Sequence, residues 1–189
     1  KRRNDAFYAD YLAGTLDEAA YLDFATSAWR HRPEPEALAM RERFVREQMR
    51  PALHADALAL VRRHQAAGDC VAIVTATNEF VTRPIADLFG IDSLLAVELE
   101  RDASGRPTGR MRSVPTFREG KVIRVQQWLS GLGHAPSDFE RITFYSDSHN
   151  DLPLLEWSTH PVATNPGAKL EAVAAERGWP ILRLFEPEQ

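Results

Sequence analysis

Short apolar runs alternate with helical segments along the chain after Pro51, and this alternation constrains the fold more than any other feature. The first run, residues 70–74, reads Cys-Val-Ala-Ile-Val and is rich in β-branched side chains. Such a continuous run is typical of a strand buried on both faces of a parallel sheet. Similar runs occur at residues 94–99, 141–145, 161–163 and 181–185. Alternating strands and helices predict an α/β fold built on a doubly wound parallel sheet.

Helices and turns are expected in the intervals between the apolar runs. Gly68 and Gly90 should end two helices, because glycine readily adopts the left-handed conformation that closes a helix. The Asp-Ala-Ser-Gly sequence within residues 101–107 predicts a turn, from which residues 108–112 return as a hairpin arm. The periodicity predicts helices at residues 56–67, 79–89, 119–129 and 168–177, and a short one from residue 152.

The first fifty residues predict helices only. An amphipathic helix over residues 6–12 stops at Gly14, and the Thr-Leu-Asp-Glu sequence that follows has the spacing of a capping box, with Thr15 as the N-cap. Another helix is expected at residues 36–49, before a hinge at Pro51. The sequence therefore predicts two domains, an all-helical one at residues 1–50 and an α/β core at residues 51–189.

Composition excludes several classes of function. The formal net charge is −4 and there is no basic run, so nucleic acid is not an expected partner, because binding to a phosphate backbone needs clustered Lys and Arg. No apolar stretch approaches the roughly 20 residues that span a bilayer. The single cysteine, Cys70, lies in an apolar run, where a buried thiol and a reducing cytoplasm are expected. The sequence leaves open whether the protein is a monomer or a homodimer.

Chemically useful side chains follow the predicted strands at the edge where doubly wound sheets place their sites. Residues 75–78 follow one strand, Asp147 and Asp151 follow another, and Lys121 stands at the start of a helix. Oxygen ligands of this kind suit Mg²⁺, which takes one or two protein carboxylates together with water and substrate phosphate. A Lys ammonium and a Thr hydroxyl can offset and bind the charge of a phosphoryl group.

The ordered set Val-Ala-Ile-Val-Thr75, then Lys121, then Tyr-Ser-Asp147-Ser-His-Asn-Asp151 resembles three motifs of the haloacid dehalogenase (HAD) superfamily, and most closely its phosphoserine phosphatase-like members with a helical cap. The resemblance implies that residues 1–50 are the cap and residues 51–189 a HAD-like core without its first strand. It also implies a Mg²⁺ site held by Asp147 with support from Asp151. By the same resemblance, the residues that would bind phosphate or substrate are Thr75, Ala76, Thr77, Asn78, Lys121, Asn150 and Asp23.

One motif of the family has no counterpart here. HAD phosphatases carry Asp-x-Asp-x-Thr on their first strand, where the first Asp attacks phosphorus to form an aspartyl-phosphate and the second is the general acid. No Asp-x-Asp pair occurs in this sequence, which begins at Lys1 rather than Met. We expect that the chain opens inside the cap and that an upstream segment supplies this motif. A non-catalytic HAD-like binding protein is the alternative.

The resemblance also bears on the substrate, a small phosphorylated metabolite. Phosphoserine phosphatases place an Arg for the substrate carboxylate where this chain has Asp23. An acid favours a cationic leaving group, and the chain is most similar to histidinol-phosphate phosphatases of the family. Phosphoserine remains the alternative substrate, and Asp10, Asp17 or Glu18 could replace Asp23 in this role. A receiver domain also gathers acids, Thr and Lys around Mg²⁺, but there the acid pair comes first in the chain and the Lys last. Here Thr75 precedes Lys121, which precedes the acids.

Overall fold

The computed structural model describes residues 2–185, and its contacts divide the chain into two compact units, Lys1–Pro115 and Thr116–Gln189. Parallel strands and helices occur in both units, and the predicted α/β class is confirmed. The contact-based boundary at residue 115 differs from the predicted boundary at residue 50. The division into a cap of residues 1–50 and a core of residues 51–189 stays a prediction.

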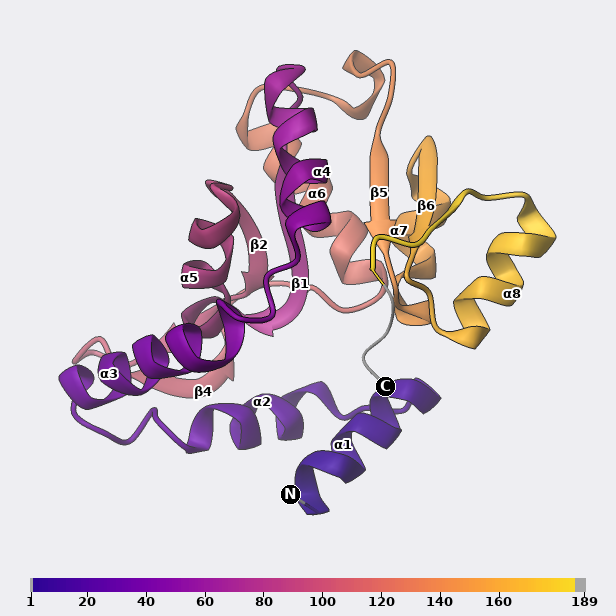
Figure 1. Ribbon diagram of the computed structural model, residues 1–189. Helices are drawn as coiled ribbons and strands as arrows, with labels where there is room; N and C mark the ends of the chain where they lie inside the picture. The colour runs from indigo at the N-terminus through magenta and orange to yellow at the C-terminus, as the bar shows by residue number, and fades with distance from the viewer. Residues whose placement is uncertain (1, 186–189) are drawn as a thin grey trace. The chain divides into compact units, whose positions relative to one another are not determined.

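The first unit begins with helices and continues with strands, as the sequence predicts (Figure 1). Its strands form a parallel pair, β1 with β2, and an antiparallel hairpin, β3 with β4. Its elements in chain order are α1 (Arg2–Ala13), α2 (Glu18–Ser27), α3 (Glu34–Phe44), a π-helical turn (Val45–Met49), α4 (Ala55–Ala66), β1 (Ala72–Asn78), α5 (Glu79–Phe89), β2 (Ser93–Val97), β3 (Leu99–Arg101) and β4 (Pro107–Met111).

Helix α2 begins later than the capping-box pattern predicts. Its N-cap is Asp17, which is in extended conformation and accepts a hydrogen bond from the Ala20 backbone N–H at 2.9 Å. The prediction of Thr15 as N-cap is wrong, because a carboxylate two residues closer to the first turn satisfies the unpaired N–H group at the third helical position. Thr15 instead directs its hydroxyl to the Asp10 carbonyl at 3.5 Å.

Helix α5 has the bounds that the sequence predicts. Asn78 is its N-cap and accepts from the Val81 backbone N–H at 3.2 Å, while Gly90 closes it with φ of 65°. The strand before it, β1, starts at Ala72 and leaves Cys70 outside. Cys70 is exposed, so the prediction of a core thiol is wrong. The reason is that an apolar run does not fix where its strand begins.

The predicted hairpin is confirmed by β3 and β4, which pair antiparallel with Leu99 opposite Met111. Its tip is organised by Asp102, whose Oδ1 accepts from the backbone N–H groups of Ser104 at 2.8 Å and Arg106 at 3.0 Å. An Asp side chain that replaces backbone acceptors in this way is typical of tight turns.

The second unit is a three-stranded parallel sheet in the order β5-β6-β7, with helices packed on it. Its core gathers Leu155, Ala163, Leu170 and Ala174, against which Trp179 packs. In chain order its elements are α6 (Glu119–Gly131), a 3₁₀ turn (Pro136–Asp138), β5 (Thr143–Ser146), a second 3₁₀ turn (His149–Asp151), α7 (Leu152–Trp157), β6 (His160–Thr164), α8 (Ala168–Arg177) and β7 (Ile181–Leu182).

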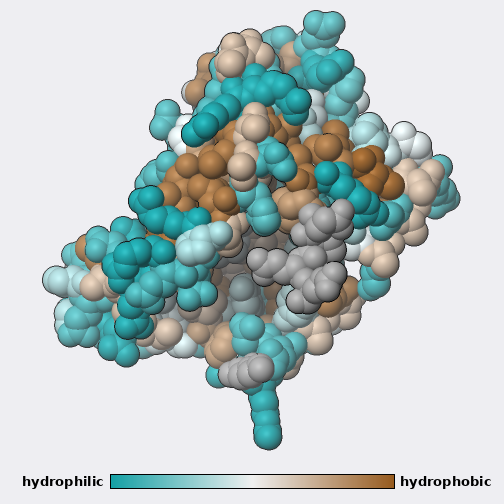
Figure 2. Space-filling model, in the orientation of Figure 1, coloured by the Kyte–Doolittle hydropathy of each residue, from teal (hydrophilic) through white to brown (hydrophobic). Residues whose placement is uncertain are grey.

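The surface mixes polar and apolar side chains. Figure 2 shows hydrophobic patches, in brown, among hydrophilic side chains on the visible face. Large exposed apolar side chains include Tyr8 and Leu12 on α1, a helix that contains no buried residue. Within residues 2–185, no helix combines the length and the apolarity that crossing a bilayer requires.

Candidate active site

The segment that contains Thr75 departs from regular strand geometry. Residues 72–74 of β1 pair regularly with β2, and the next pair joins Asn78 to Val97, so the register is irregular from Thr75 to Thr77. Thr75 Oγ1 accepts a hydrogen bond from the Thr77 backbone N–H at 3.2 Å, and Ala76 between them is half-buried. Irregular pairing of this kind re-aims side chains at the end of a strand.

Asn78 joins this segment to helix α5. It is the last residue of β1, it is buried, and its side chain caps the helix. Its backbone carbonyl also accepts from the Thr82 hydroxyl at 2.9 Å. Asn78 therefore fixes the backbone of the predicted phosphate-binding segment at its carboxyl end. Direct contact of Asn78 with phosphate stays a prediction.

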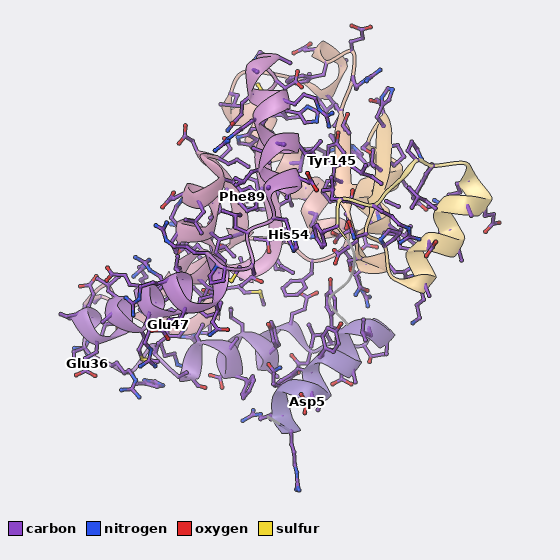
Figure 3. All side chains as sticks on the ribbon, viewed as in Figure 1. Asp5, Glu36, Glu47, His54, Phe89 and Tyr145 are labelled. Carbon is purple, nitrogen blue, oxygen red and sulfur yellow. The ribbon has the colours of Figure 1, made fainter. Side chains whose placement is uncertain are left out.

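In the second unit, strand β5 leads directly into the predicted acidic motif. Tyr145, which is labelled in Figure 3, and the buried Ser146 end the strand. Asp147 follows and is exposed. The Asp147 carbonyl accepts from the Gly167 backbone N–H at 3.3 Å, which ties the motif to the start of α8. The sequence thus places an exposed carboxylate at the carboxyl end of a parallel strand, as predicted.

Lys121 and Asp151 form a buried ion pair in the second unit. Lys121 Nζ lies 2.6 Å from Asp151 Oδ1, and the two side chains are 6% and 9% exposed. Helix α6 supplies the Lys, and the turn before α7 supplies the Asp. Burying two charges costs desolvation free energy, which their mutual attraction and further hydrogen bonds must offset. This pair therefore holds α6 against the acidic motif.

Sequence reasoning missed one member of this cluster, Ser146. Its hydroxyl donates to Asp151 Oδ2 at 2.8 Å, so each carboxylate oxygen of Asp151 has a partner. The signal was present, since a small polar residue ends an otherwise apolar strand directly before Asp147. Four residues separate Ser146 from Asp151, and the 3₁₀ turn that ends at Asp151 brings the two together.

The remaining residues of the motif lie on the turn itself. The Asn150 backbone N–H donates to Ser148 Oγ at 3.3 Å, and the Asn150 side chain is half-buried. His149 is exposed. The role of Asn150 beside the phosphate stays a prediction.

Asp23 lies on α2 in the first unit and is engaged in an ion pair. Its Oδ1 lies 2.5 Å from Arg30 Nη2, and the two side chains are 57% and 11% exposed. Arg30 also donates to Thr26 Oγ1 at 2.9 Å. The guanidinium passes against Gly109 on β4, where a Cβ would overlap it. Arg30 therefore orients the Asp23 carboxylate and partly offsets its charge.

The donor set fits a magnesium ion better than a transition metal. Between residues 2 and 185 there is no cluster of three or more His, Cys, Asp and Glu side chains with the spacing of metal ligands. Zinc sites commonly need three or four such ligands. Mg²⁺ keeps several waters and binds through one or two carboxylates plus substrate phosphate. The exposed carboxylate of Asp147 could supply one such ligand, while Asp151 supports the site through its pair with Lys121.

Comparison with known proteins identifies the family. Residues 2–156 match the haloacid dehalogenase-like hydrolase family, and the chain belongs to it. The predicted superfamily and the predicted class of enzyme, a HAD-type hydrolase, are confirmed. The chain is 39% identical over 180 residues to a histidinol-phosphatase of Neisseria meningitidis, covering 95% of this chain and 81% of that protein.

Solved structures support the same fold. A Bordetella pertussis protein of unknown function is 47% identical, with a TM-score of 0.91 and coverage of 97% of this chain and 82% of that one. A phosphoserine phosphatase solved as a phospho-aspartyl intermediate analogue has a TM-score of 0.65 at 15% identity, covering 98% of this chain and 81% of that one. At 15% identity this second likeness supports the fold alone.

Proposed function

We propose that this protein is a Mg²⁺-dependent phosphomonoester hydrolase that acts on a small amino-alcohol phosphate such as histidinol phosphate. The observation that carries the proposal is the buried Lys121–Asp151 pair beside the strand that Asp147 follows. Membership of the HAD-like hydrolase family and the 39% identity to a histidinol-phosphatase support it.

Each side chain has a role in this chemistry. Lys121 offsets the negative charge of the phosphoryl group, and unit charges about 4 Å apart interact by about 4 kcal/mol at an effective dielectric near 20. Thr75 donates its hydroxyl to a non-bridging oxygen, with the backbone of Ala76 and Thr77 beside it. Asp147 would hold Mg²⁺, with Asp151 supporting the site through its pair with Lys121, and the ion would supply charge neutralisation to the phosphate when bound.

The metal assignment is tested by Asp147→Asn in the full-length protein. We expect Mg²⁺-dependent turnover of phosphate esters to fall by about 100-fold or more, because the amide carries no charge to hold the ion. The measurement is kcat/KM over a magnesium titration. Asp138→Asn is the control, since Asp138 is an exposed acid of the same unit that accepts a local backbone hydrogen bond. Undiminished turnover in Asp147→Asn would contradict the assignment.

The second part of the proposal is the identity of the phosphate ester that the enzyme hydrolyses. Histidinol phosphate carries an amine and an imidazole and no carboxylate, so an acidic side chain favours it over phosphoserine. Asp23 is the exposed carboxylate that we assign to this selection, oriented by Arg30. A panel that includes histidinol phosphate and phosphoserine separates the two candidates. A full-length protein that hydrolyses no phosphate ester would point to the non-catalytic alternative.

The role of Asp23 is tested by Asp23→Asn. We expect kcat/KM for histidinol phosphate to fall by about 10-fold, while kcat/KM for the uncharged leaving group of p-nitrophenyl phosphate stays unchanged, because a partly offset surface charge contributes modestly. Glu36→Gln is the matched control, since Glu36 is also an exposed helical acid paired with an Arg. Equal losses on both substrates would remove Asp23 from substrate selection.

A further inference from the structure

Ser146 holds a buried carboxylate from the side opposite the lysine. Asp151 Oδ1 faces Lys121 Nζ at 2.6 Å, and Asp151 Oδ2 faces Ser146 Oγ at 2.8 Å. All three residues are buried. They come from the end of β5, the start of α6 and the turn before α7. Three separate elements thus meet through one carboxylate.

The direction of the Ser146 hydroxyl proton follows from its two contacts. Ser146 Oγ accepts a hydrogen bond from the Ser148 backbone N–H at 3.1 Å. Its second contact is the Asp151 carboxylate, which accepts and does not donate when ionised. The hydroxyl proton is therefore directed at Asp151 Oδ2, and the backbone of the turn sets the rotamer of Ser146.

We propose that Ser146 is a positioning residue, which fixes the Asp151 carboxylate and through it the Lys121 ammonium in the orientation that phosphoryl transfer needs. This inference rests on the proposed phosphatase function and deepens it. The Ser146 hydroxyl contacts the Asp151 carboxylate and the Ser148 backbone N–H, so it would act through the carboxylate. Residues that orient a catalytic or metal-binding group change activity by about 10- to 100-fold when they are removed.

A buried carboxylate that loses one hydrogen-bond donor is destabilised unless another donor or water replaces it. In Ser146→Ala, Asp151 Oδ2 keeps its charge and loses its donor, which is unfavourable in a buried setting. The carboxylate then rotates toward any other donor or toward water. Lys121, a flexible four-carbon side chain, follows it. The ammonium leaves the position that it needs to meet the phosphate.

The kinetic test uses the full-length enzyme and three variants. In Ser146→Ala we expect kcat to fall by about 10- to 100-fold, with KM changed less than about threefold, since the ammonium acts mainly as charge develops. Ser146→Thr retains the hydroxyl and should recover kcat to within about threefold of wild type. Ser158→Ala is the matched control, because Ser158 is a buried serine of the same unit whose hydroxyl donates to the Leu155 carbonyl at 2.8 Å.

A second readout does not depend on activity. The chain has three lysines, Lys1, Lys121 and Lys169, so reductive methylation followed by peptide mass spectrometry reports Lys121 separately. Lys169 is exposed on α8 and serves as the internal reference. We expect Lys121 to be labelled at least about fivefold faster in Ser146→Ala than in wild type, and at the wild-type rate in Ser146→Thr and Ser158→Ala.

The outcomes separate this inference from the proposed function. A wild-type enzyme without phosphatase activity overturns the function, while faster labelling of Lys121 in Ser146→Ala still supports the positioning of the lysine. Wild-type activity together with unchanged kcat in Ser146→Ala overturns the inference alone. Lost activity with unchanged Lys121 labelling also overturns it, because Ser146 would then act by another route. If Ser146→Ala and Ser158→Ala change kcat and Lys121 labelling equally, Ser146 contributes only to packing and the inference is overturned.

Discussion

At the scale of single residues, Lys121 is defined by its buried partner. Lys121 is one of three lysines in a chain with twenty arginines, and it is buried against Asp151. A Lys ammonium is a compact point charge, whereas the planar Arg fork needs room for several donors. Lys at this position would therefore suit the proposed phosphoryl-binding site, which has to admit a phosphoryl group beside the cation.

Arg118, three residues before Lys121, has φ of 43°, in the region that favours glycine. It sits in the turn whose Gly120 N–H bonds the Phe117 carbonyl at 2.7 Å. We expect Arg118→Gly to raise the free energy of unfolding by about 1 kcal/mol, because glycine adopts this conformation without strain. Urea unfolding measures the change. Arg118→Ala keeps the strain and removes the same side chain, so a comparable gain in that variant would contradict the explanation.

At the scale of elements, local hydrogen bonds determine where helices and turns begin. Asn78 ends β1 and starts α5 in one residue, so the candidate phosphate segment and the helix share an anchor. The β3–β4 hairpin is held in a similar way by the carboxylates of Glu100 and Asp102. Such side-chain caps fix an element without a large apolar core.

The hairpin should lose stability in acid. A hydrogen bond from Thr108 and then one from Arg110 lower the pKa of Glu100, and a hydrogen bond from Ser104 lowers the pKa of Asp102. A carboxyl with a lowered folded-state pKa stabilises the fold above its unfolded pKa, about 4.3 for Glu and 3.9 for Asp. That stability is lost as the pH falls through the lowered values.

Amide hydrogen exchange in residues 99–111, followed from pH 6 to pH 3, measures this effect. We expect protection to fall toward pH 3 after correction for the intrinsic exchange rate. Thr108→Val removes the main cause of the Glu100 shift, so its protection should depend less on pH. A pH dependence equal to that of wild type would show that the hydrogen bond from Thr108 to Glu100 contributes nothing to this effect.

At the scale of the whole molecule, each of the two units contains its own buried residues. The second unit packs Leu155 and Leu170 around its three-stranded sheet, and the first buries Val97 and Leu99. The predicted ligands of one metal, Asp147 and Asp151, both belong to the second unit. Binding of Mg²⁺ there should stabilise the folded enzyme, because the unfolded chain does not hold the two carboxylates together.

The thermal unfolding of the full-length protein tests this linkage. At a Mg²⁺ concentration ten times the dissociation constant, we expect the free energy of unfolding to rise by about 1.4 kcal/mol. Asp147→Asn should remove most of this gain, and chelation should reverse it in wild type. Ca²⁺ at the same concentration serves as the ionic control. An equal gain in wild type and in Asp147→Asn would place the ion elsewhere.

The sequence by itself determined the order of the elements, the α/β class and the positions of Lys121 near the start of a helix and of Asp147 directly after a strand. Thr75 was expected to follow its strand and lies within β1 instead, because β1 continues to Asn78. It also determined the bounds of α5, since Asn78 and Gly90 are strong local signals. These features depend on apolar periodicity and on neighbouring residues, which a single sequence displays directly.

Only the tertiary structure decided which polar groups pair. Asp151 meets both Lys121 and Ser146, and Asp23 meets Arg30, which needs the space left by Gly109. It also decided that Cys70 is exposed. The physical reason is that buried charges select partners by distance and desolvation in three dimensions, and separation along the chain does not encode either quantity.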